Sequence, residues 1–165
     1  MPLLHVGRCF IMLFVKETHA MNRFVRIAIA AIAISGCSQK MNFEKIPEAE
    51  VNQAQRAAAE SWATLRLTSW AQERYPPPGN ELSKEMQPGQ SETRQKETDK
   101  QLESIVGDFK SMSYFETRKS VPANFVIYRF KGAFTKEDVM EIRMVYNLQG
   151  NIDGFWIKPW LNSMQ

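Results

Sequence analysis

The most reactive side chain in the sequence is the thiol of Cys37, and the residues before it follow a defined order. Arg23 and Arg26 come first, an apolar run covers residues 27–34, and the small residues Ser35 and Gly36 stand directly before the cysteine. A basic stretch, an apolar stretch of about 7–15 residues and small residues at the cut are typical of a secretion signal. Eight apolar residues are too few for a hydrocarbon core, which takes about 20 residues of helix. We therefore expect a cleaved signal rather than a permanent membrane span.

The end of this segment resembles the lipobox of bacterial lipoproteins, in which a branched apolar residue and two small residues precede a cysteine. The four positions are Ile34, Ser35, Gly36 and Cys37. The resemblance implies cleavage between Gly36 and Cys37, a diacylglyceryl group on the thiol and acylation of the freed amine. Several acyl chains attach a protein durably to a membrane. The expected partners are the membrane itself and the lipoprotein processing and sorting machinery; the alternative is a small buried cysteine at a helix end.

The residue after the cysteine bears on location. In lipoprotein sorting an aspartate at that position implies retention in the inner membrane, and this chain has Ser38 there. By the same resemblance, Ser38 implies a lipid anchor in the outer membrane, with the protein facing the periplasm.

The N-terminal part divides into segments. The basic region of a signal normally stands at the start of the chain, so we expect Met21 to be the initiator and residues 1–20 to be untranslated. A longer signal beginning at Met1 is the alternative. Residues 21–36 are then the signal peptide, residues 37–46 a polar tether and residues 47–165 the folded domain.

Few reaction types remain open to the mature chain, because it has no histidine and no cysteine besides Cys37. Imidazole catalysis, Ser-His-Asp and Cys-His triads, thiolate or imidazole metal sites and disulfides are excluded. We expect no metal, no cofactor and no enzymatic activity. The remaining candidates for acid–base chemistry are Asp108, Asp138, Asp153, Tyr114, Tyr128 and Tyr146. None of them lies in a recognisable motif, and the aspartates suit turns and caps.

The charge distribution argues against a nucleic-acid partner. The formal charge is +3, but residues 1–36 hold four basic residues and one acidic residue, so the rest of the chain has 17 of each. Binding to phosphates needs an excess of positive charge on the folded domain. A neutral domain does not provide it.

The elements of the domain follow from hydrophobic periodicity. Helical spacing over residues 47–75 predicts one long amphipathic helix that Pro47 opens and three prolines end. A second, short helix is expected over residues 91–107, with solvated first turns and Gly107 as its cap. Alternation then predicts strands at 109–118, 125–134, 139–147 and 152–158. Short turns make such strands antiparallel.

These elements predict an α+β domain in which a curved antiparallel sheet of three or four strands packs on the two helices. Segments 105–112, 128–130, 141–146 and 150–159 resemble small NTF2-like or cystatin-like domains of unknown function. This chain keeps the glycine and the proline of the family's typical ending, as Gly154 and Pro159, but has Asn151 where lysine is usual. The resemblance implies a cone with an open mouth. NTF2-like enzymes such as ketosteroid isomerases use a carboxylate base there, which is the enzymatic alternative.

Aromatic side chains could line that cone or fill it. The candidate pocket residues are Trp62, Trp70, Tyr128, Phe130, Tyr146 and Trp156. On the other set of strand positions, Arg129, Lys131, Arg143 and Glu141 predict a solvated sheet face rather than an anion site. The expected function is a lipid-anchored cell-envelope protein whose non-catalytic module binds a protein partner or a small apolar ligand. A purely structural lipoprotein is a further alternative.

Overall fold

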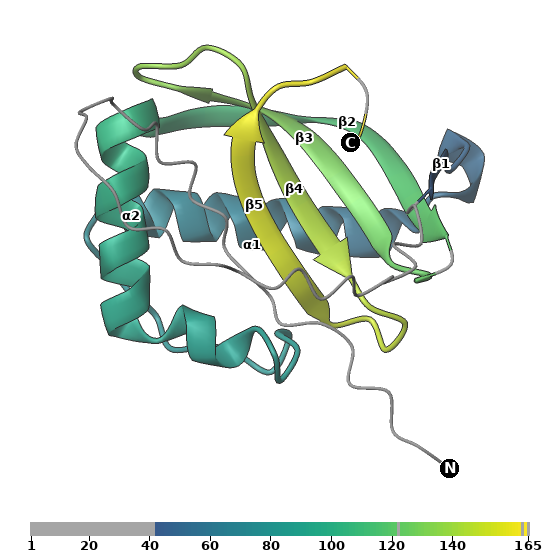
Figure 1. Cartoon of the computed structure of the whole chain (residues 1–165), viewed down its shortest axis with the longest axis horizontal. Helices are drawn as coiled ribbons and strands as arrows, with labels where there is room; N and C mark the ends of the chain where they lie inside the picture. Colours follow the sequence, from purple (N-terminus) through teal and green to yellow (C-terminus); the bar gives the residue numbers. More distant parts are fainter. Residues whose placement is uncertain (1–41, 122, 163, 165) are drawn as a thin grey trace, which may run out of the picture. The chain divides into compact units, whose positions relative to one another are not determined.

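The computed structural model describes residues 42–121, 123–162 and 164, and the fold is given for these residues alone (Figure 1). The predicted lipobox, the predicted signal peptide and the expected start at Met21 lie outside them. The elements are β1 (Asn42–Lys45), η1 (Glu48–Glu50), α1 (Gln53–Ala71), η2 (Gln87–Gln90), α2 (Glu92–Val106), β2 (Phe109–Val121), β3 (Val126–Phe134), β4 (Met140–Tyr146) and β5 (Ile152–Pro159). Residues 40–165 form one compact unit. No helix in the described part is long and apolar enough to cross a membrane.

The five strands form one antiparallel sheet in the order β1-β2-β3-β4-β5. The predicted α+β class and the antiparallel meander are confirmed, but the predicted strand count of three or four is too low. The extra strand is β1, which lies in the segment expected to be a polar tether. Its sequence has no long apolar alternation, and it is held by pairing of Asn42 with Val121 and Lys45 with Arg118 on β2.

Helix α1 is shorter at both ends than the predicted 47–75. It begins after Asn52, whose side chain accepts a hydrogen bond of 3.0 Å from the Gln55 amide, and Asn is a favourable N-cap. Pro47 instead precedes the 3-10 turn η1. At the other end the helix stops at Ala71, and Glu73 already has a left-handed φ of 51°. The helix therefore ends before the prolines that were expected to terminate it.

Helix α2 begins and ends close to the predicted positions, and most side chains of its first turns are exposed, as the sequence predicted. It has 15 residues, and Gly107 caps it with a φ of 77°. Gln95 and Asp99 are the exceptions and are buried. Gln95 donates to the Pro76 and Gln90 carbonyls, and the Asp99 carboxylate accepts a 2.8 Å hydrogen bond from Arg66 of α1. An ion pair between the two helices thus replaces the apolar face that the sequence lacks in these turns.

The core lies between α1 and one face of the sheet, as Figure 1 shows with α1 running behind the strands. Alternate residues of β3 and β4 supply the sheet side, as the period of two predicted. The buried side chains of these strands and of α1 are Tyr128, Phe130, Phe134, Ile142, Met144, Tyr146, Ala59, Ala63, Leu67 and Trp70. The Trp70 and Phe134 rings meet at 6.4 Å between centroids.

Candidate functional site

The six residues expected to line a pocket do not come together around one cavity. Four of them are packed in the core at 5% exposure or less: Trp70, Tyr128, Phe130 and Tyr146. Trp62 lies at the rim of the helix layer. Trp156 points to the opposite face of the sheet, where it pairs in register with Arg143 and is 37% exposed. The alternation in β5 decides this placement, since Phe155 and not Trp156 packs against the core.

The tyrosines in the core are packed and hydrogen-bonded. The Tyr128 hydroxyl donates to Gln55 Oε1 at 2.9 Å, and its ring meets Tyr146 edge-on at 5.6 Å. Burial raises the pKa of both hydroxyls to about 12. These side chains stay neutral and fill the space between the sheet and α1. The sequence had left open whether the aromatic side chains line a cavity or fill it, and these two fill it.

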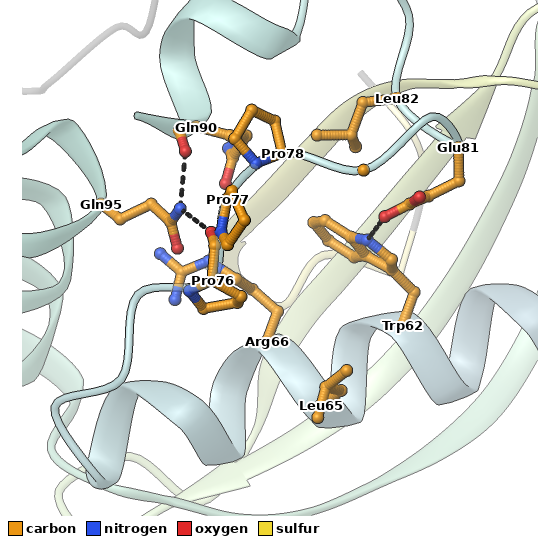
Figure 2. Close-up of a pocket in the computed structure, with 11 residues that line it drawn as sticks. Trp62, Leu65, Arg66, Pro76, Pro77, Pro78, Glu81, Leu82, Gln90 and Gln95 are labelled. Atoms are coloured by element: carbon orange, nitrogen blue, oxygen red, sulfur yellow. Dashed lines mark hydrogen bonds between the residues drawn. The ribbon is translucent and has the colours of Figure 1, made fainter. Parts of the chain in front are cut away.

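A shallow pocket lies at the rim, between α1, the proline loop and α2 (Figure 2). Trp62 Nε1 donates to Glu81 Oε1 at 3.1 Å on one side, and Gln95 Nε2 donates to the Pro76 carbonyl at 2.7 Å on the other. The cavity volume is about 130 Å³. Small-molecule sites are usually about 300–1,000 Å³, so this pocket suits a single small group rather than a whole ligand.

The acidic and tyrosine candidates for acid–base chemistry are dispersed. Asp108 and Asp138 are exposed, and the Asp108 amide donates to Thr135 Oγ1 at 2.8 Å, which is a turn contact. The Tyr114 hydroxyl shares a hydrogen bond of 2.8 Å with Thr117. Asp153 is half-buried on β5. Among the residues the structure describes, no cluster of His, Cys, Asp and Glu could hold a metal ion.

The sheet face that points away from α1, here called the outer face, carries a charged network instead. The register of β2 to β5 puts these side chains on it: Glu116, Arg118, Arg129, Lys131, Glu141, Arg143, Trp156 and Lys158. The prediction of a solvated face is wrong at its centre. Arg129 and Glu141 are 0% exposed there.

Arg129 links the two carboxylates of the outer face. Its Nε and Nη2 donate to Glu141 at 2.9 and 3.1 Å, and its Nη1 donates to Glu116. Arg143 adds a 2.7 Å hydrogen bond to Glu141, and Arg118 binds Glu116 through two nitrogens at 2.7 and 3.1 Å. Each carboxylate is therefore shared by at least two guanidinium groups.

The network alters the pKa of its members. Burial alone raises the pKa of Glu141, but hydrogen bonds from Arg129 and Arg143 outweigh it, so the pKa lies below the usual 4.5. Burial likewise raises the pKa of Glu116, and Arg118 and Arg129 lower it further than burial raises it. Both groups are carboxylates at neutral pH. A general base acting near pH 7 needs the opposite shift, so neither carboxylate is suited to that role.

Aromatic side chains cover the centre of the outer face. Phe115 and Trp160 meet edge-on at 4.8 Å. The Arg129 guanidinium lies 5.0 Å from the Trp160 ring centroid, and Lys131 Nζ lies 4.8 Å from it. The segment after β5 turns back over the strands (Figure 1), and the Leu161 carbonyl accepts a 2.7 Å hydrogen bond from Arg129.

Phe115 and Glu116 share this face because β2 has a register shift between Tyr114 and Glu116 that leaves Phe115 without a partner on β3. A bulge inserts one residue and breaks the alternation of faces. Reasoning from the sequence missed Phe115, Glu116, Trp160 and Lys158 as members of one surface. The signal available was the pairing of opposite charges two residues apart, Glu116 with Arg118 and Glu141 with Arg143, since such residues share a face of a strand.

Comparison of the chain with protein-family descriptions, with curated proteins and with solved structures gives no match. The geometry of the outer face and the filled core therefore carry the functional argument.

Proposed function

We propose that this chain is a lipid-anchored bacterial cell-envelope protein, held by acylated Cys37, whose α+β domain is a non-catalytic module that binds its partner through its surface. The anchor rests on the sequence Ile34, Ser35, Gly36 and Cys37. By the resemblance, Ser38 favours the outer membrane with the domain facing the periplasm. The arrangement of a helix against an antiparallel sheet supports the NTF2-like or cystatin-like resemblance.

The observation that carries the binding role is the contrast between the two faces of the sheet. The face against α1 is filled by packed aromatic and aliphatic side chains, among them Tyr128 and Phe130 at 0% exposure. The outer face presents charged and aromatic groups around Arg129. A partner is thus better accommodated on the outer face than a small apolar ligand is inside the cone.

The anchor is tested by the intact mass of the full chain purified from bacterial membranes, for the wild type and for Cys37→Ala. We expect a wild-type species that begins at Cys37 and carries added acyl mass. The variant should lack that species. An unacylated wild-type chain that retains Met1 or Met21 would contradict the lipoprotein proposal.

The non-catalytic role is tested separately. An NTF2-like enzyme with a carboxylate base should show turnover of a test substrate that is lost in Asp108→Asn or Asp153→Asn. We expect no turnover that depends on either residue. Detection of such turnover would favour the enzymatic function over the non-catalytic binding module.

A further inference from the structure

We propose that the outer face docks on the surface of an anionic phospholipid membrane, so that the domain lies against the bilayer that holds its anchor. This deepens the proposed function. The occupant is the headgroup layer, recognised by cationic side chains and by amphipathic aromatic groups beside them.

Charge is the first argument. Across β2 to β5 the outer face has five cationic side chains, Arg118, Arg129, Lys131, Arg143 and Lys158, and two carboxylates, Glu116 and Glu141. Arg129 is fully buried, so the cations that headgroups could reach are the other four. The mature chain as a whole is neutral by residue count, so the excess of three positive charges is local to this surface. Anionic lipids attract such clusters at short range.

The second argument is the apolar surface mixed with these cations. Phe115, Trp156 and Leu161 are 41%, 37% and 43% exposed. Trp156 folds back over Gly154, where an added Cβ would stand 1.8 Å from the indole. Aromatic rings and cations side by side are typical of residues at the membrane–water interface.

Lys158 supplies a third argument, because its contact within the fold is long and its side chain is partly exposed. Its Nζ lies 4.0 Å from Glu141, which already receives hydrogen bonds from two arginines, and 30% of its side chain is exposed. Lys158 can therefore also reach a negative group outside the fold.

The tether length agrees with this geometry. Five residue steps separate Cys37 from Asn42 at the start of β1, and they span at most about 18 Å when extended. Strands stand about 4.8 Å apart, so four steps from β1 to β5 cover roughly 19 Å. A tether of this length limits the distance between the anchor and the start of β1 to about 18 Å.

The test uses residues 38–165, which contain the entire compact unit and lack Cys37, so that any vesicle binding is independent of the anchor. Co-sedimentation compares vesicles of phosphatidylglycerol and phosphatidylcholine mixed with vesicles of phosphatidylcholine alone. The variant Lys131→Gln/Lys158→Gln removes two cations from the outer face. The matched control, Lys96→Gln/Lys100→Gln, removes two exposed cations from α2.

We expect binding to the anionic vesicles that weakens as salt rises, since each cation near such a surface contributes about fivefold. The outer-face variant should bind about 25-fold more weakly and the control within about twofold of the wild type. Equal binding to both vesicle types, or equal loss in both variants, would overturn the proposal. Binding to polyglutamate without binding to phosphatidylglycerol would overturn it in favour of an acidic protein partner.

The two proposals fail separately. Acylation of Cys37 without vesicle binding by residues 38–165 leaves the anchor in place and removes the docking surface. If the full chain from membranes carries no acyl group but residues 38–165 bind the anionic vesicles, the anchor is contradicted and the docking surface stands.

Discussion

Replacing Arg129 with methionine tests whether the outer-face network stabilises the fold. Arg129 is fully buried and donates hydrogen bonds to both Glu116 and Glu141. Methionine occupies part of the same space but leaves both buried carboxylates without their shared cation. Removing one partner of a buried ion pair costs about 3–5 kcal/mol of unfolding free energy. Because Arg118 and Arg143 still bind one carboxylate each, we expect a loss near the lower end, about 3 kcal/mol.

The assay is urea unfolding of residues 38–165 at neutral pH, followed by circular dichroism and extrapolated linearly to water. The matched control is Arg56→Met. Arg56 binds Glu48 at 2.7 Å, but the two side chains are 30% and 62% exposed, and such pairs contribute about 0–1 kcal/mol. If Arg129→Met loses no more stability than Arg56→Met, the network is energetically neutral and the reasoning is refuted.

Two further predictions concern pH and backbone conformation. Because the pKa values of Glu116 and Glu141 are lowered from 4.5 in the fold, their stabilisation is present above pH 4.5 and is lost as the pH falls through the lowered values. The urea midpoint of the wild type should therefore fall on acidification more steeply than that of Glu141→Gln, and coinciding profiles would contradict this. Gly107 has a φ of 77°, and an added Cβ would stand 2.0 Å from Thr135 Oγ1, so Gly107→Ala should lose about 1–3 kcal/mol in the same urea assay. Gly89→Ala, where a Cβ meets nothing within 4 Å, is the control, and an equal loss there would exclude backbone strain as the cause.

Local patterns in the sequence were sufficient to predict the main helices and strands. The alternation in β3 and β4 predicted the core side chains of the sheet, since a strand's faces follow from a period of two alone. The end of α2 was predicted because Gly107 is a local helix-ending signal. The first turns of α2 have no apolar face and were therefore predicted to be solvated, which was wrong for Gln95 and Asp99.

That error and the others have one physical cause, which is that burial of polar groups depends on partners distant in the chain. Asp99 is buried because Arg66 lies 33 residues away in sequence and beside it in space. Similarly, β1 is a strand only because β2 offers it an edge.

The outer face is where the tertiary structure decided most. The sequence determined that Arg129, Glu141 and Arg143 share one face, because their spacing within strands is fixed. It did not determine whether water reaches them. That depends on the bulge that puts Phe115 and Glu116 on the same face of β2 and on the segment after β5, whose Leu161 carbonyl accepts a hydrogen bond from Arg129 across 32 residues. Such contacts form only when the sheet is assembled, so periodicity along a single strand carries no information about them.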